Sequence, residues 1–484
     1  MKVSELNSVE KTTDAAPQKS WLVIGGGVMG LKIARDLQQR GQNVTIAEAA
    51  PTFGGLTSAW TLGQTAWDRF YHVTLLSDSK LRELLDELDL EKEIDWVETK
   101  TGFYAGGKLL SMSNTAEFLR FPPLSMIERL RLGGTIFLAS KIKNWRRMEK
   151  LSVEKWLRRW SGNGAFEKVW LPLLKAKLGE AYKQTSAAFI WAHTARMYKA
   201  RRSGAKKEMF GYVPGGYARI LESWTDMLAQ RGVRLLAGHP VQSIRKTQSD
   251  DGILEVDFGD GRVEKFDNVV STIASPLIAR SCDELTDVEK KQLEEIRYLG
   301  VVCASMLLEK PISPYYVTNI TDTWVPLTAV IEMSTIVNSE TQLGGKHLVY
   351  LPKYLPDDHD GLNESDQDYK EKCLSTLEKM YDHFSRDNVI DFKVARAKYV
   401  AALSTIDYST RLPPIVTSVP GFYALNSAHI LEGNLNVNET ITLGETKLEE
   451  LVWPDFLNRT LLASAADHGN HHAIDGKDLA VSST

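Results

Sequence analysis

The chain has 484 residues, of which 25% are charged and 43% hydrophobic, and its formal net charge is -4. These values are typical of a globular protein with two or three domains and exclude a disordered chain. The negative net charge argues against nucleic acid as the main partner, because binding a phosphate backbone requires an excess of basic residues.

The cysteine and apolar patterns bear on the compartment. The three cysteines, Cys282, Cys303 and Cys373, are far apart and match no metal-ligand spacing, which predicts a reducing environment and no metal site. The first twenty residues lack the apolar core of a secretory signal, and no run reaches the ~18 apolar residues that span a bilayer. We therefore expect a cytoplasmic protein with flexible ends at 1–19 and 461–484.

Residues 20–48 predict a βαβ unit around a glycine turn. An apolar strand at 21–24 leads into the turn 25–30, a helix covers 31–39, and a second strand at 44–47 ends at Glu48. An acid about 20 residues after such a turn is placed to accept both hydroxyls of an adenosine ribose, which disfavours NADP. The pattern predicts a bound dinucleotide.

Each residue of the turn suits that ligand. Gly25 permits the tight turn, Gly27 lets backbone amides approach a pyrophosphate, and Gly30 lets the helix pack closely on the sheet. Val28 and Met29 at the helix start offer free N–H groups and the positive end of the helix dipole to phosphate.

The residues after this unit resemble a known flavoprotein superfamily. A second glycine pair stands in the run Gly54-Gly55-Leu56-Thr57, and the run 67–72 follows. This order resembles the two-dinucleotide-binding-domain flavoproteins: flavin amine oxidases, protoporphyrinogen oxidases, phytoene-type desaturases and UDP-galactopyranose mutases. The resemblance implies an α/β fold, with a Rossmann-type FAD domain, an inserted mixed-sheet substrate domain and a helical cap.

The same resemblance assigns the glycine pair to the cofactor. Gly54, Gly55, Leu56 and Thr57 would continue the FAD cradle towards the flavin ring. Most members have Arg where this chain has Leu56, so Thr57 and Ser58 are candidate hydroxyl substitutes. The last hundred residues contain no Cys that could tether the flavin, and FAD is therefore expected to be noncovalent.

Later segments resemble the parts of the superfamily that return to the FAD domain. After a Pro-Gly-Gly turn, a helix and a strand, Val241 matches the position whose backbone brackets the adenine. An Asp-Gly hairpin is predicted over 254–266, and a buried parallel strand over 268–272 would end at Thr272 over the FAD.

The segment 421–441 resembles the C-terminal flavin motif of a strand, a loop and a helix start. Amides and the dipole at that helix start would stabilise negative charge on a reduced flavin. The residues expected to contact the cofactor here are Asn426, Asn436, Asn438 and Glu439.

The resemblance also implies the domain limits. The FAD domain would comprise 20–75, 213–282 and 399–460. The segment 76–212 would be a helical cap, on the substrate or membrane side, and 283–398 would be the substrate-binding domain.

The segment 121–160 alternates basic residues with leucines and tryptophans and contains few acids. A basic amphipathic helix with tryptophans is typical of a segment that lies on anionic lipid, here the inner face of a membrane. The alternative is a helical cap whose arginines are solvated.

The resemblance implies an FAD-dependent oxidase or dehydrogenase that moves a hydride from a C–N or C–C bond of a small molecule to flavin, with oxygen or a quinone as the electron acceptor. His72 is the candidate catalytic residue, as a hydrogen-bond donor to flavin or substrate, or else a half-buried structural histidine. One alternative is a redox-neutral enzyme like UDP-galactopyranose mutase, with Arg196, Arg201 and Arg202 binding the diphosphate of a nucleotide sugar. Another is a carotenoid or terpenoid desaturase or isomerase.

Overall fold

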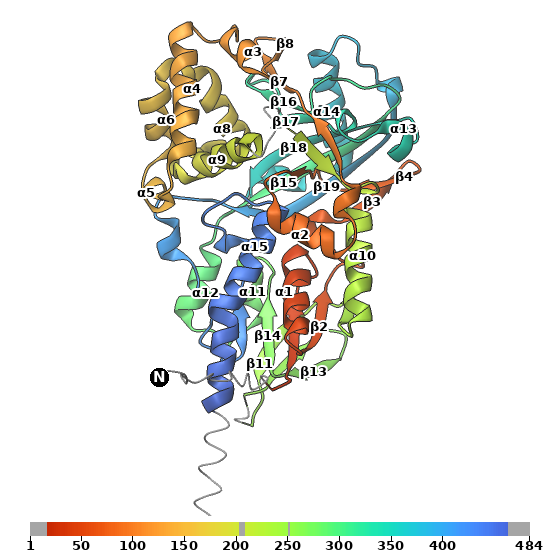
Figure 1. Ribbon diagram of the computed structural model, residues 1–484, viewed down its shortest axis with the longest axis vertical. Helices are drawn as coiled ribbons and strands as arrows, with labels where there is room; N and C mark the ends of the chain where they lie inside the picture. Colours follow the sequence, from red (N-terminus) through yellow and green to blue (C-terminus); the bar gives the residue numbers. More distant parts are fainter. Residues whose placement is uncertain (1–16, 203–208, 250–251, 463–484) are drawn as a thin grey trace, which may run out of the picture.

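The computed structural model describes residues 17–202, 209–249 and 252–462. Two parts are stacked along its long axis, the lower built on a parallel sheet and the upper on a mixed sheet with a group of helices beside it (Figure 1). The α/β class expected from the sequence is confirmed.

The lower part is organised around a five-stranded parallel sheet. Its order is β10-β2-β1-β14-β20, and its strands are β1 (Ser20–Ile24), β2 (Asn43–Glu48), β10 (Arg234–Ala237), β14 (Asn268–Ser271) and β20 (Phe422–Ala424). The inner strands are nearly continuous apolar runs, because both faces of a parallel sheet are covered. The predicted βαβ unit and the parallel strand after 268 are confirmed.

Two further layers cover this sheet. On one face lie α1 (Val28–Gln39), α2 (Ser79–Glu87), α10 (Gly216–Gln230) and α15 (Val437–Lys447). On the other lie β11 (Ser243–Lys246), β12 (Leu254–Asp257), β13 (Val263–Phe266), α11 (Ser275–Ser281) and α12 (Asp287–Glu294). β12 and β13 form the predicted hairpin.

The upper sheet has seven strands in the order β19-β15-β18-β17-β16-β7-β8. They are β7 (Thr101–Ala105), β8 (Lys108–Ser111), β15 (Tyr298–Leu308), β16 (Val317–Ile320), β17 (Ala329–Glu332), β18 (His347–Pro356) and β19 (Val389–Ala402). α14 (Asp366–Met380) covers one face. α13 (Ser339–Gln342) lies at the sheet's end (Figure 1). Cys303 is fully buried in β15.

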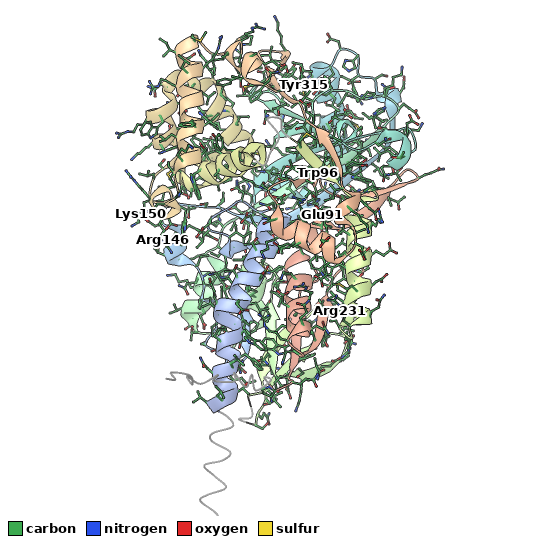
Figure 2. The ribbon with its side chains drawn as sticks, viewed as in Figure 1. Glu91, Trp96, Arg146, Lys150, Arg231 and Tyr315 are labelled. Atoms are coloured by element: carbon green, nitrogen blue, oxygen red, sulfur yellow. The ribbon has the colours of Figure 1, made fainter. Side chains whose placement is uncertain are left out.

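The segment 76–212 is not purely helical. Its strands β7 and β8 extend the substrate-side sheet through a parallel pairing of β7 with β16. Gly102 of β7 makes this join close, because a Cβ there would collide with the ring of Tyr315, which Figure 2 labels near the top of the molecule. β19 likewise keeps the chain in the upper sheet until Ala402, past the expected limit at 399.

Short strands connect the two parts. β3 (Ala59–Leu62) pairs with β4 (Thr65–Asp68), and β9 (Met209–Tyr212) pairs with both β5 (Thr74–Leu75) and β6 (Asp95–Glu98).

The helical group lies beside the upper sheet (Figure 1). Its members are α3 (Thr115–Leu119), α4 (Met126–Lys141), α5 (Trp145–Glu149), α6 (Val153–Ser161), α7 (Asn163–Ala165), α8 (Leu171–Leu178) and α9 (Ala188–Arg202). The basic segment 121–160 is helical but divided, because the chain breaks at 142–144, where the side chain of Asn144 caps α5, and again before α6. Among the described residues, no helix is long and apolar enough to cross a membrane.

Candidate functional site

The glycine turn between β1 and α1 has the close contacts that the sequence predicts. Gly25 has a φ of +100°, and a Cβ there would meet the hydroxyl of Thr272. A Cβ on Gly30 would collide with the carbonyl of Gly25. The Thr272 hydroxyl donates to the carbonyl of Ile24 at 2.9 Å, so the end of β14 is fixed beneath the turn.

Next to this turn is a space without side chains. Gly27 is the N-terminal cap of α1, and no side chain caps the helix. The nearest heavy atom to a Cβ built on Gly27 is the Cα of Gly55, at 4.0 Å. The two glycine segments are held together by the Gly54 N–H, which donates to the Gly26 carbonyl at 2.8 Å. Val28 and Met29 therefore begin a helix whose N-terminus faces a cradle of glycine backbone.

Glu48 lies at the edge of the cradle. Its carboxylate accepts the Gly26 N–H at 2.7 Å and the Ala50 N–H at 2.8 Å. The backbone N–H of His239 donates to the Glu48 carbonyl at 2.8 Å, which brings the loop with Val241 beside the end of β2. Two positions predicted for the adenosine end of a dinucleotide are thus neighbours.

The two hydroxyls after the glycine pair have different roles. Thr57 donates to the Gly54 carbonyl at 2.9 Å, so it closes its own turn. The buried hydroxyl of Ser58 has no hydrogen-bond partner among the described residues. Leu56, Tyr71 and Leu435 pack against a buried hydrophobic cluster, the substrate-side cluster, whose members include Tyr350 and Cys303.

The C-terminal segment uses its polar side chains to hold backbone. Asn436 caps α15 by accepting the Glu439 N–H at 3.0 Å. Asn438 accepts the N–H groups of Lys80 and Leu81 at the start of α2. Asn426 donates to the Ile273 carbonyl at 2.9 Å.

These contacts bring the end of β20 and the start of α15 to the same edge of the sheet as the glycine turn. Any contact from this segment to a cofactor would therefore be made mainly by its backbone.

His72 lies in a desolvated group of polar residues. Its Nδ1 is 3.1 Å from the Phe70 carbonyl and 3.8 Å from the Asp68 carboxylate, and its ring packs on Tyr217. Burial lowers the pKa of His72 to about 4, against the opposing effect of the Phe70 carbonyl. The ring is thus neutral at pH 7, and the Phe70 contact assigns the proton to Nδ1.

Asp68 is the residue of this group that the sequence analysis missed. Burial raises its pKa to about 8, although its carboxylate accepts the Tyr217 N–H at 2.8 Å. A Cβ on Gly216 would touch that carboxylate, so the Gly-Gly turn before α10 admits it. The sequence features that could have identified Asp68 are the run 67–72 and the glycine turn at 213–217.

The described residues fit a dinucleotide. The glycine cradle would be filled by a Cβ at Gly27, the helix start is uncapped by side chains, and Glu48 is bonded to the loop that leads to Val241. The described residues include no group of three or more His, Cys, Asp or Glu that could hold a metal ion.

Residues 30–425 match the model of the flavin-containing amine oxidoreductase family. The chain belongs to this family. Its members share a flavin cofactor, so the chain is a flavin-dependent oxidoreductase enzyme. The Rossmann-type domain and mixed-sheet domain expected from the resemblance are confirmed by the solved structures it resembles.

Among curated proteins, the zeta-carotene desaturase of Synechocystis sp. is 23% identical over 255 residues, covering 48% of this chain. The match spans about half the length of that relative, 51%.

Two of the solved structures with a similar fold illustrate the likeness. A protein from Exiguobacterium sp. 255-15 assigned as a protoporphyrinogen oxidase has a TM-score of 0.71 at 17% identity, covering 90% of this chain and 99% of that one. Wild-type putrescine oxidase with bound putrescine has a TM-score of 0.67 at 17% identity, with coverage of 90% and 99%. At these identities the likeness concerns the fold alone.

Proposed function

We propose that this protein holds FAD noncovalently and oxidises a CH–CH unit of a small, largely apolar organic molecule to C=C, which removes a hydride and a proton. The observation that carries the proposal is the space beside Gly27 and Gly55 at the uncapped start of α1. Glu48 at the rim favours FAD over NADP, because its carboxylate would repel a 2′-phosphate.

Each predicted cofactor residue has a role in this proposal. The N–H groups of Val28 and Met29 would bind the pyrophosphate, Glu48 the ribose, and the backbone at Val241 the adenine. The turn 54–57 and the helix start at 436–439 would hold the flavin. Bound FAD would supply the hydride acceptor.

The substrate side supports an apolar substrate. Leu56, Tyr71 and Leu435 pack against the hydrophobic cluster that contains Tyr350. The hydride would pass to the cofactor and the proton to an uncharged base, for which the Nε2 lone pair of His72 would be available while Nδ1 holds the proton. His72 is neutral and Asp68 protonated at pH 7. We propose that His72, locked by the Phe70 carbonyl, positions the substrate or the flavin.

The site is less suited to oxidising the C–N bond of a protonated amine. An ammonium group needs an ionised acid or an equivalent acceptor. The carboxylate of Asp78 is already paired with Arg196 at 3.0 Å, and the raised pKa of Asp68 keeps that group neutral. The similarity to a carotene desaturase also favours carbon–carbon chemistry.

The mutase alternative receives no support. Of its three proposed diphosphate ligands, Arg196 is paired with Asp78, and the side chains of Arg201 and Arg202 lie outside the described residues.

We also propose that α4 rests on the surface of an anionic bilayer on the cytoplasmic side, from which an apolar substrate would enter. Four side chains along one side of α4 are exposed: Ile127 by 72%, Leu130 by 61%, and Met126 and Phe137 by 56%. Exposed apolar residues so close together mark an interaction surface.

Basic residues follow the apolar face of α4. The ammonium group of Lys141 lies 5.2 Å from the ring centre of Phe137. Arg146 and Lys150 project from α5 at the edge of the molecule (Figure 2). Apolar insertion and basic attraction are the two requirements for binding an anionic surface.

The test of the cofactor and reaction begins with the visible spectrum of the purified protein. Acid precipitation should release FAD into the supernatant, and a flavin that stays with the pellet would overturn noncovalent binding. Under anaerobic conditions we expect a carotenoid or porphyrinogen to bleach the flavin, and air or a quinone to restore it. Bleaching by putrescine alone, or turnover of UDP-galactopyranose only after prereduction, would select the amine-oxidase or mutase alternative.

The test of membrane contact is co-sedimentation with vesicles. We expect binding to phosphatidylglycerol-containing vesicles, little binding to phosphatidylcholine alone, and loss of binding in the double variant Ile127→Ser, Leu130→Ser. Val288→Ser on α12 is the control, since that side chain is 67% exposed on another part of the molecule. Equal binding of the two variants would overturn the proposal.

A further inference from the structure

A group of basic residues lies where the helical group meets the substrate-side cluster. His193 of α9 has an exposed side chain, yet desolvation, aided by the positive charges of Lys177 and Arg196, lowers its pKa to about 4.

Lys177 of α8 reaches the residues of the substrate-side cluster through Tyr354. Its ammonium group lies 3.1 Å from the ring centre of Tyr354, and the Tyr354 hydroxyl lies 3.0 Å from that of Tyr71. Tyr354 packs against both the substrate-side cluster and the helical core. Within the described residues, Lys177 forms no ion pair, whereas Lys175 two residues earlier pairs with Glu180 at 3.7 Å.

Two further donors, one on Arg196 and one on Tyr217, are without partners in the described part of the chain. The buried Nε of Arg196 has no hydrogen-bond acceptor, although its Nη2 pairs with Asp78. The buried hydroxyl of Tyr217, whose ring packs on His72, also has none. Each of these donors can therefore take an acceptor that the described residues do not supply.

We propose that Lys177, with His193 and the Nε of Arg196 beside it, binds a carboxylate of the substrate, while the apolar body of that substrate extends past Tyr71 towards Leu435. This inference rests on the proposed function and names its substrate class: an apolar molecule that bears one carboxylate.

The charges of the group favour a single carboxylate over other ions. Arg196 is neutralised by Asp78 and His193 is uncharged at pH 7, so Lys177 contributes the one unbalanced positive charge among them. A diphosphate would bring more negative charge than this group offsets, and an ammonium group would be repelled. A carboxylate has a single negative charge, which matches that of Lys177, and it accepts hydrogen bonds from the donors of the group.

The test measures binding to the FAD-loaded enzyme by the change in the flavin absorbance spectrum. The probes are decanoate, decanol and decylamine, which share one chain and differ in the polar end. We expect wild type to bind decanoate at least about tenfold more tightly than decanol or decylamine. Lys177→Met should remove this preference and leave decanol binding unchanged.

Two variants control for folding and for charge in general. Lys175→Met removes an exposed cation from the same helix and should keep the preference. Lys177→Arg keeps the charge and should restore most of it, even if Lys177→Met folds poorly. Equal binding of decanoate and decanol by wild type, or loss of the preference in Lys175→Met, would overturn the inference.

The outcomes separate this inference from the proposed function. A polyene that bleaches the flavin, in an enzyme that binds decanoate no more tightly than decanol, would leave the oxidase proposal standing and overturn the carboxylate site. Binding of decanoate that depends on Lys177, in an enzyme whose flavin no donor reduces, would do the reverse.

Discussion

The carboxylate of Glu48 accepts the backbone N–H of Gly26 at 2.7 Å and holds the glycine turn against the end of β2. Its other oxygen accepts the Ala50 N–H. Glu48→Ala would remove an ionised acceptor from both groups, so we expect the free energy of unfolding of the FAD-free protein to fall by about 1–3 kcal/mol. Urea denaturation checks this. Glu264→Ala, which breaks the partly exposed pair with Arg234, should cost less than about 1 kcal/mol; equal losses would contradict the structural role.

Gly27→Ala separates folding from cofactor binding. The backbone at Gly27 has a φ of -76°, which alanine adopts readily, and a Cβ there would have no atom closer than 4.0 Å. We expect the FAD-free variant to be as stable as wild type and to bind FAD at least about a hundredfold more weakly, because the methyl group occupies the place of the pyrophosphate. Thermal unfolding and FAD titration measure the two effects.

Gly134→Ala serves as the matched control for that variant. A Cβ at this helical glycine would also meet nothing within 4 Å, and it lies in α4, in the upper part of the molecule. It should leave FAD affinity unchanged. Unaltered FAD binding in Gly27→Ala would remove the main support for the cradle.

Asp68 makes the folded protein less stable as the pH rises. Its pKa is about 8 when folded, against an ordinary value of 3.8, so the folded chain holds one more proton than the unfolded chain between these values. Stability therefore falls as the pH rises through this window, by up to about 1.4 kcal/mol per unit. Asp68→Asn keeps an acceptor for the Tyr217 N–H and should flatten this fall. Asp226→Asn, exposed on α10, should not.

His72 acts in the opposite pH direction. Its pKa falls from 6.5 to about 4 on folding, so below pH 6.5 the unfolded chain binds a proton that the folded chain does not. Stability is therefore lost as the pH drops from 6.5 to 4. His72→Gln should reduce this acid sensitivity, measured as the thermal midpoint at several pH values, while the exposed His359→Gln should not. An identical acid profile for wild type and His72→Gln would show that His72 is solvated.

The parts of the fold that the sequence predicts are those with local signals. The unit 20–48, the hairpin 254–266 and the strand after 268 each carry their own glycine or apolar pattern. The run 101–111 has a comparable pattern, but its place in the upper sheet depends on pairing with β16, more than two hundred residues away. No local pattern reports such a partner.

The candidate site likewise has features that the local sequence predicts and features that it does not. Backbone positions of the cradle follow from the glycines, because only glycine permits those approaches. Other features of the site depend on burial and on residues from distant segments. They are the different roles of the Thr57 and Ser58 hydroxyls, the protonation of Asp68 and the contact of Lys177 with Tyr354. Residue type alone does not contain this information.

The strand order of the lower sheet has a consequence for biosynthesis. β1 and β2 leave the ribosome early, but β14, which lies beside β1, follows after residue 268, and β20 completes the sheet only after residue 422. Domains generally fold as units during synthesis, and this one cannot close until most of the chain exists. The nascent protein must therefore keep an apolar, unpaired strand edge protected for most of its translation, and it can bind its flavin only near the end.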